Sequence, residues 1–107
     1  MPRYLVRASY SNRGIADLMQ NPEDRAAAVR PVIEGLGGRL ESFDFVLGED
    51  DVVFIAEFPD NVSAAAFSMA ATATGAISSF KTSPLLSPDE AMDAMKRAGR
   101  AGYRPPG

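Results

Sequence analysis

The sequence predicts an α+β fold, in which one antiparallel sheet carries helices on one of its faces. Strand-like and helix-like segments follow one another in the order β-α-β-β-α-β, with a further helix at the end, and a tight acidic turn joins the two middle strands. A chain of 107 residues with 46% hydrophobic content is typical of one domain. We therefore expect a ferredoxin-like arrangement, with the first and third strands in the centre of the sheet.

The first third of the chain predicts a strand followed by a helix. Residues 4–10 alternate aromatic and β-branched side chains with others, as a half-buried strand does. Residues 15–19 favour a short helical turn. Asn21 and Pro22 then predict the start of a longer helix, since Asn caps well and Pro fits the first turn. Pro31 lies inside this helix and should kink it, and glycines at 35, 37 and 38 end it.

The middle of the chain predicts a β-hairpin closed by acidic residues. Residues 39–47 and 52–58 are strand-like, and the turn between them reads Gly-Glu-Asp-Asp. A turn with an even number of residues fixes which side chains face one another across the hairpin. The pairs are then Leu47 with Val52, Phe45 with Phe54, and Phe43 with Ala56. We expect all six under the helices, on the same side as Tyr4, Val6, Ala8 and Tyr10.

The last third predicts two helices around a fourth strand. Residues 59–61 cap an alanine-rich helix that runs to about Thr74, and residues 76–83 form the strand. Ser87-Pro88-Asp89-Glu90 is a capping box that opens the last helix, whose Met92 and Met95 we expect to point inward. The domain should span residues 1–98, with residues 99–107 as a flexible tail.

The face of the sheet opposite the helices is predicted to be half apolar. Soluble monomers rarely leave such a contiguous patch exposed. We therefore expect a homodimer that buries this face sheet against sheet, with Arg7 and Lys81 near Asp44 and Glu57. The predicted interface residues are Leu5, Arg7, Asp44, Val46, Val53, Ile55, Glu57, Ile77 and Lys81.

The composition excludes several classes of function. A formal net charge of −3 argues against nucleic-acid binding, which needs a basic face. The chain has no Cys, His or Trp, so thiolate chemistry, a serine–histidine triad and common zinc or haem ligands are missing. We expect no cofactor. No apolar run is long enough for a bilayer, and the N-terminus enters a strand directly, so the expected location is cytoplasmic.

Several motifs resemble the GYD domain family, small proteins of largely unassigned function. They are Tyr4-Leu5-Val6, the helix-to-strand turn at residues 36–40, Leu47-Gly48-Glu49 with Asp51, the helix entry at 57–60, and the final capping box. The resemblance implies a ferredoxin-like fold of the dimeric α/β-barrel type. The family is named after a Gly-x-Tyr-Asp turn; Gly48 and Asp51 match it, whereas Asp50 occupies the Tyr position.

Two groups of acidic residues are candidate sites. Glu49, Asp50 and Asp51 offer oxygen ligands for Mg²⁺ or Ca²⁺. Successive carboxylates on a tight turn point in different directions, however, so we interpret them as turn residues and predict no metal site. Asp44 and Glu57 are carboxylates in otherwise apolar strands, where partial burial would favour general acid or base chemistry. The interpretation that we favour is an ion pair with Arg7 or Lys81.

Tyrosine and serine hydroxyls form a third candidate. The alanine-rich second helix leaves room for a pocket against the sheet, in which Tyr4, Tyr10 or Ser78 would orient a small ligand. Tyr10 is also a candidate for proton transfer. A fourth group, Lys96, Arg97, Arg100 and Arg104, lies at the C-terminal end and could attract acids of another subunit, but the interpretation that we favour is a solvated helix end.

These observations leave three functional hypotheses. The leading one is a small homo-oligomeric protein that binds a small ligand or acts structurally, without catalysis. The second is a cofactor-free isomerase, lyase or monooxygenase-like enzyme using Asp44, Glu57 or a Tyr on a small organic molecule, an analogy that the fold alone supports. The third is an effector-sensing module that acts through a partner.

Overall fold

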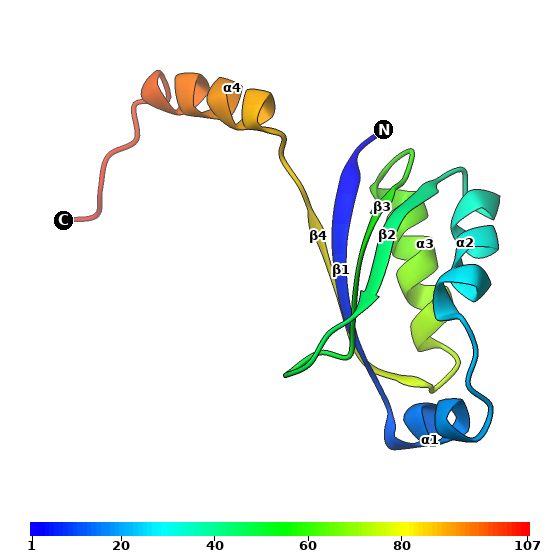
Figure 1. Ribbon diagram of the computed structural model, residues 1–107. Helices are drawn as coiled ribbons and strands as arrows, with labels where there is room; N and C mark the ends of the chain where they lie inside the picture. The colour runs from blue at the N-terminus through cyan, green and yellow to red at the C-terminus, as the bar shows by residue number, and fades with distance from the viewer.

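The structure, a computed structural model, describes residues 1–107 and confirms the α+β fold. Four strands form one sheet, and three helices gather on or beside one of its faces while the fourth extends away (Figure 1). The elements are β1 (Arg3–Tyr10), α1 (Asn12–Gln20), α2 (Arg25–Gly35), β2 (Arg39–Phe45), β3 (Val52–Glu57), α3 (Asn61–Thr72), β4 (Ile77–Pro84) and α4 (Pro88–Gly99).

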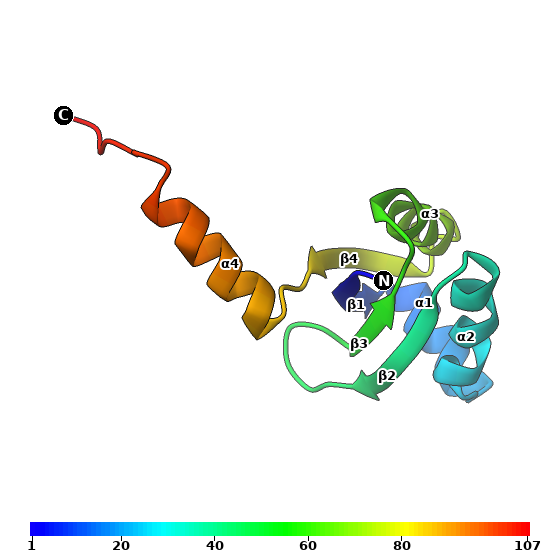
Figure 2. The ribbon, with the colours of Figure 1, turned by 90° about the horizontal axis from the view of Figure 1, so that it is seen from above.

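The sheet has the predicted topology. Its strand order is β2-β3-β1-β4 and every neighbouring pair is antiparallel, so β1 and β3 are central. Seen from above, α2 and α3 lie on one side of the sheet (Figure 2). The other side, which we call the open face, carries Leu5, Arg7, Asp44, Val53, Ile55, Glu57 and Lys81, which alternate along the strands with buried residues.

The core lies between the sheet and α2 and α3. Its buried side chains are Tyr4, Val6, Ile33, Leu40, Phe54, Ala56, Phe58, Ala64 and Phe67. The ring of Phe67 packs against Phe54 and Phe58 with centroid separations of 5.9 and 6.0 Å. Tyr4 is 2% exposed, and its hydroxyl donates to Oδ1 of Asn61 at 2.6 Å. The apolar side of β1 is therefore pinned to the first turn of α3.

The connection between β1 and β2 contains two helices, not one helix after a short turn. The backbone N–H of Asn21 donates to the carbonyl of Asp17 and closes α1, so Asn21 does not start the next helix. Asp24 is the cap of α2, because its carboxylate accepts the N–H of Ala27 at 3.2 Å. Pro31 lies inside α2 as expected.

The hairpin register differs from the prediction by two residues. Phe45 pairs with Val52 and Phe43 with Phe54, because the connection spans residues 46–51; a bulge between Leu40 and Ser42 shifts the pairing by one further residue at the start of β2. Since a shift of two preserves the alternation of faces, Phe43 still stacks on Phe54 at 5.5 Å. Leu47 was predicted under the helices and is instead 99% exposed in the loop.

Helix α4 does not pack on the domain, which corrects the expected inward position of Met92 and Met95. Both are exposed, and the helix has no buried residue. The capping box itself is confirmed: Ser87 Oγ accepts the N–H of Glu90, and Glu90 accepts the N–H of Ser87. These bonds lower the pKa of Glu90. The last bond to the sheet is made by Leu85, whose N–H donates to the carbonyl of Arg3.

A glycine substitution tests the close approach of β2 to β3. A Cβ on Gly38 would lie 2.3 Å from the carbonyl oxygen of Glu57, so Gly38→Ala forces the backbone apart. We expect it to lower the free energy of unfolding by about 1–3 kcal/mol, as overpacking does. Gly35→Ala is the control, since a Cβ there meets nothing within 4 Å and Ala favours a helix. Equal urea midpoints for both variants would contradict the steric argument.

Candidate functional site

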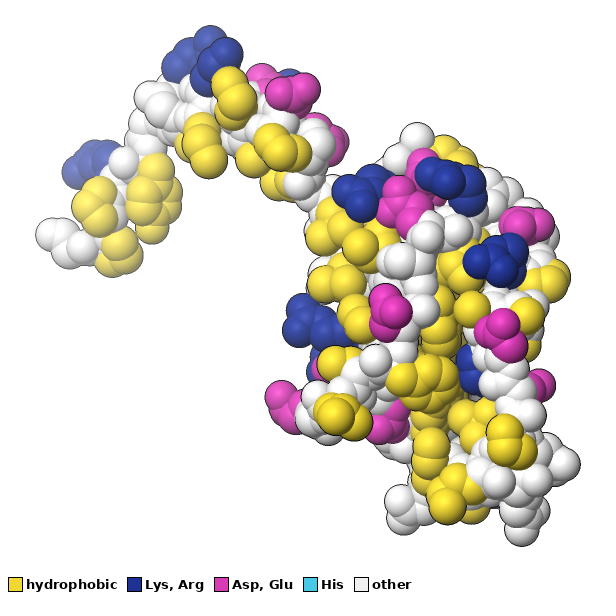
Figure 3. Space-filling model, viewed as in Figure 1, with side chains coloured by type: hydrophobic (Ala, Val, Ile, Leu, Met, Phe, Trp, Pro, Cys, Tyr) yellow, Lys and Arg dark blue, Asp and Glu magenta, His cyan; other side chains and the backbone are white.

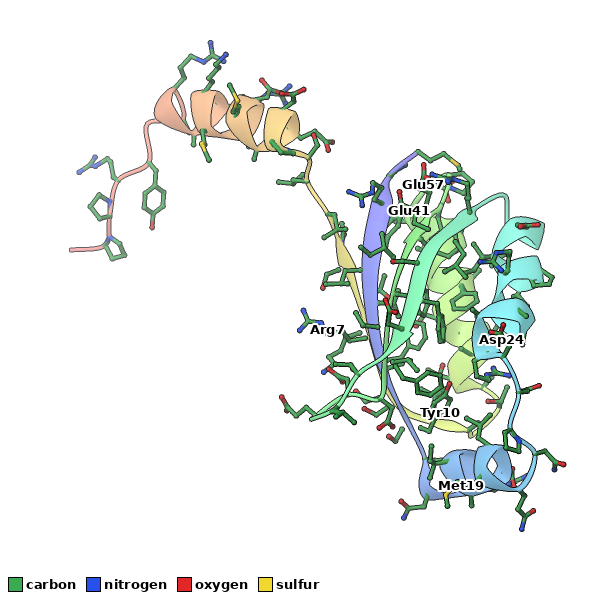
Figure 4. The ribbon with its side chains drawn as sticks, viewed as in Figure 1. Arg7, Tyr10, Met19, Asp24, Glu41 and Glu57 are labelled. Carbon is green, nitrogen blue, oxygen red and sulfur yellow. The ribbon has the colours of Figure 1, made fainter.

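A pocket lies where the end of β1 meets α1 and the start of α2. Its volume is about 380 Å³. It is lined by Tyr10, Gly14, Asp17, Leu18, Asn21, Glu23, Arg25, Ala71, Thr74, Ala76 and Ile77. Figure 4 shows Tyr10 at the end of the sheet nearest α1. Such a volume is at the small end of ligand sites, which suits a molecule with a single ring.

Tyr10 and Arg25 are a polar pair in the wall of this pocket. Burial raises the pKa of the Tyr10 hydroxyl, and the carboxylate of Asp51 adds to the rise. The nearby guanidinium of Arg25 opposes it. Burial lowers the pKa of Arg25, but the bond with Glu23 and the nearby Tyr10 phenol outweigh that effect and raise it. The pocket therefore presents a neutral phenol beside a permanent cation, which Glu23 pairs at 2.6 Å.

A smaller apolar hollow of about 50 Å³ continues the pocket toward the core. Tyr10, Arg25, Ala71 and Ile77 line both spaces. The remaining walls of the hollow are Ala8, Val29, Phe43, Val52, Phe54, Phe67 and Phe80. In the space-filling view, hydrophobic side chains form a band beside α2 (Figure 3). Tyr10 and Arg25 thus lie at the border between the polar pocket and the apolar interior.

A bulge in the pairing of β1 with β4 positions Tyr10. The register shifts after Ser9, and the Ser78 hydroxyl contacts the carbonyls of Ser9 and Tyr10 at 3.3 and 3.2 Å. Ser78 therefore holds the backbone and does not line the pocket. The same bulge places Ile77 opposite Tyr10. This corrects the prediction that Ile77 lies on the open face: it lines the pocket instead.

Tyr4 lines a different cavity, between β4 and α3. This second cavity of about 310 Å³ also contains Asn61, Ala65 and Ser68, so the alanine-rich helix does leave space against the sheet. The buried hydroxyl of Thr82 has no hydrogen-bond partner there. The Tyr4 hydroxyl is already engaged by Asn61. Because this cavity offers only neutral groups, the pocket at Tyr10 has the richer chemistry.

Asp44 and Glu57 lie on the open face, away from the Tyr10 pocket. Glu57 forms an ion pair with Arg39, directly opposite it in the register, and not with Arg7 or Lys81 as predicted. The residue of β1 that lies opposite Glu57 is Arg3. Arg7 lies farther along β1, opposite Val53, and so is distant from Glu57 (Figure 4). Asp44 forms no ion pair. The structure therefore does not bring the three candidates for proton transfer together.

The acidic loop between β2 and β3 is tied to β1 and β4. Asp51 accepts the backbone N–H of Tyr10 at 2.9 Å and donates its own N–H to the carbonyl of Ala8 at 2.9 Å. Asp50 pairs with Lys81 at 3.0 Å. Gly48 adopts a φ of 125°, a conformation that glycine accepts without strain. No group of three or more acidic side chains in the chain is arranged to hold a metal ion.

The comparisons with known proteins identify the family. A sequence model of the GYD domain matches residues 4–95. The chain belongs to the GYD domain family. Neither the curated proteins nor the solved structures contain a significant match. The function of the GYD family is unknown, and nothing in the match assigns catalysis. No helix of this GYD protein is long and apolar enough to cross a membrane.

The pocket contains three charged residues that were not predicted as site residues, namely Asp17, Glu23 and Arg25. Arg25 was not singled out, although an arginine in the first turn of a helix is unfavourable for the helix dipole. This unfavourable position of Arg25 in the helix is the feature of the sequence that could have identified it as a site residue. Glu23 and Asp17 gave no comparable signal, since acidic residues around helix ends are common.

The Tyr10–Arg25 pair predicts an unusual tyrosine titration. Because the folded-state pKa is raised, the phenol should ionise above the value of about 10 found in model peptides. Stability is retained below pH 10 and falls as the pH rises through the raised pKa. Arg25→Met should raise the pKa further, since Arg25 lowers it. NMR titration of the ring carbons measures this, with Arg30→Met as control; an unchanged value in Arg25→Met would contradict the contact.

Proposed function

We propose that this GYD protein binds a small neutral organic molecule in the pocket at Tyr10. The observation that carries the proposal is the Tyr10–Arg25 pair at the border of the polar pocket and the apolar hollow. Two hydrogen-bond donors beside an apolar wall that includes Leu18 and Ile77 suit a ring with one acceptor group, such as a carbonyl. The ring would lie in the pocket, with its acceptor oxygen on Tyr10 and Arg25.

The charges of the pocket favour a neutral ligand over an anion. Asp17 and Glu23 line it together with Arg25, so two carboxylates face one cation. A carboxylate ligand would have to displace Glu23 from its 2.6 Å contact and approach Asp17. A carbonyl compound needs only a hydrogen bond and leaves the ion pair intact. Catalysis is not part of the proposal. The only carboxylates in the wall of the pocket are Glu23, which is paired with Arg25, and Asp17, which is exposed to solvent.

Acetophenone and benzoate form a matched pair of probes for this site. We expect acetophenone to bind more tightly than benzoate, with Tyr10 and Arg25 resonances shifting on titration. Arg25→Met should weaken acetophenone binding by about tenfold, whereas Arg30→Met, on the exposed side of α2, should not change it. Glu23→Gln should improve benzoate binding. Binding of neither probe, or equal affinities in Arg25→Met and wild type, would overturn the proposal.

We also propose that two copies associate through the open face. Leu5, Val53 and Ile55 are partly exposed at its centre, and no helix of the same chain covers them. Charged residues border them: Arg7, Asp44 and Lys81 lie in one cross-strand row with Val53. An apolar centre with a charged rim is typical of an interface. The ion pairs of Arg39 with Glu57 and of Arg3 with Glu41 lie at the end of the same face.

A single charge in the centre of the open face tests the dimer. Ile55→Lys should convert a wild-type dimer into a monomer, because the added ammonium would be buried without a partner. Val62→Lys is the control, since Val62 is 78% exposed on α3, at the helix-covered side. Native mass spectrometry and light scattering measure the mass. A wild-type monomer, or a dimer that survives Ile55→Lys, would contradict the proposal.

A further inference from the structure

Helix α4 does not pack against the sheet or the other helices of its own domain. It leaves the sheet after Leu85 and projects on the side of the open face (Figures 1 and 2). The radius of gyration is 17.1 Å, compared with about 13 Å expected for a compact domain of this length. The GYD match runs to residue 95 and so includes most of α4. The helix is therefore part of the family domain and not an appended tail.

One side of α4 is apolar and unpartnered. Leu86, Met92 and Met95 are exposed, Met95 to 69%. In Figure 3 the hydrophobic side chains of α4 gather on the side that faces the space beside the open face, and the basic side chains lie on the other side and at its far end. A helix of this kind is stable in water only when its apolar side packs on something.

A second apolar segment projects from the same face at the other end of the sheet. The loop between β2 and β3 swings to the side of α4 in both views (Figures 1 and 2). It carries Val46 and Leu47, which are 40% and 99% exposed. Acidic residues follow them at 49–51. The loop is anchored through Asp51 and Asp50, so its exposed apolar side chains are held in place.

We propose that α4 is a clasp that packs on the loop between β2 and β3 of a second copy of this chain. The inference rests on the proposed dimer through the open face. If the two sheets face each other with their strands running in opposite directions, the α4 end of one copy lies over the loop end of the other. The contact then occurs twice, because a two-fold axis makes it reciprocal.

Charge complementarity supports a second copy as the occupant. Lys96, Arg97 and Arg100 lie in and just after the last turn of α4. The stretch from Glu41 to Asp60, which contains the loop, has seven acidic residues and no basic one. Apolar contacts from Met92 and Met95 to Leu47 would therefore be bordered by attraction between the basic helix end and the acidic loop.

The connection to the sheet disfavours docking of α4 on its own open face. Leu85 is hydrogen-bonded to β1, and the capping box begins at Ser87, so only Leu86 is free between two fixed points. A 12-residue helix is about 18 Å long. With so short a hinge, the far end of α4 lies well outside its own sheet, as Figure 2 shows.

Cysteine cross-linking tests the clasp, because the chain contains no Cys. Met95→Cys is mixed with Leu47→Cys on a second, size-tagged copy, and the mixture is oxidised mildly. We expect the mixed disulfide dimer to form about tenfold more than with Val62→Cys as the partner. Equal yields with Val62→Cys, or a preference of Met95→Cys for itself, would overturn the clasp.

A second measurement separates the clasp from the dimer. Met92→Glu with Met95→Glu should weaken dimerisation by about tenfold or more, while circular dichroism remains that of the folded domain, since neither residue is buried. If Ile55→Lys breaks the dimer but the α4 variant leaves its dissociation constant unchanged, the sheet dimer stands and the clasp is wrong. If the wild type is a monomer, both proposals fail.

Discussion

The dominant constraint on this structure is that one sheet has two faces and the chain covers only one of them. β1 is hydrogen-bonded on both sides, so its side chains must alternate between a helix-covered face and an open one. Tyr4, Val6 and Ala8 take the covered side and are almost fully buried. Leu5 then has to point the other way, whatever its own preference. The half-apolar open face is thus a direct consequence of burying the alternate residues of the same strand.

The sequence was sufficient to predict the parts of the fold that depend on alternation and on caps. The order of strands, the central position of β1 and β3, and the capping box at Ser87 follow from local patterns that tertiary contacts do not override. The hairpin register was wrong by two residues because the six-residue length of the connection is not visible in the hydrophobic pattern, and neither is the bulge after Leu40. The hydrophobic pattern shows only whether the connection has an even or an odd number of residues, because that decides which face each side chain takes. The predicted even number was correct.

The candidate site was less predictable, because it depends on a second bulge. Tyr10 was identified as a candidate from its residue type, but the shift after Ser9 decides what surrounds it. That shift turns Ile77 into a pocket wall and Ser78 into a backbone anchor. Arg25 lies near Tyr10 but belongs to another element, at the start of α2, whose first residue was itself predicted three positions too early. Long-range pairs of this kind leave no periodic trace in a single sequence.

The acidic turn links these features. Asp51 accepts the N–H of Tyr10, so the loop that carries Leu47 also fixes the backbone of the pocket residue. The family tyrosine would stand at Asp50, whose carboxylate here pairs with Lys81 across β1. Both contacts are made by acids that looked like metal ligands in sequence, and both hold the loop in one position. A loop fixed in this way serves the pocket on the helix side and presents its apolar tip on the open side. If α4 of a second copy packs on that tip, as proposed, it contacts the same loop that fixes the backbone of Tyr10 through the Asp51 carboxylate.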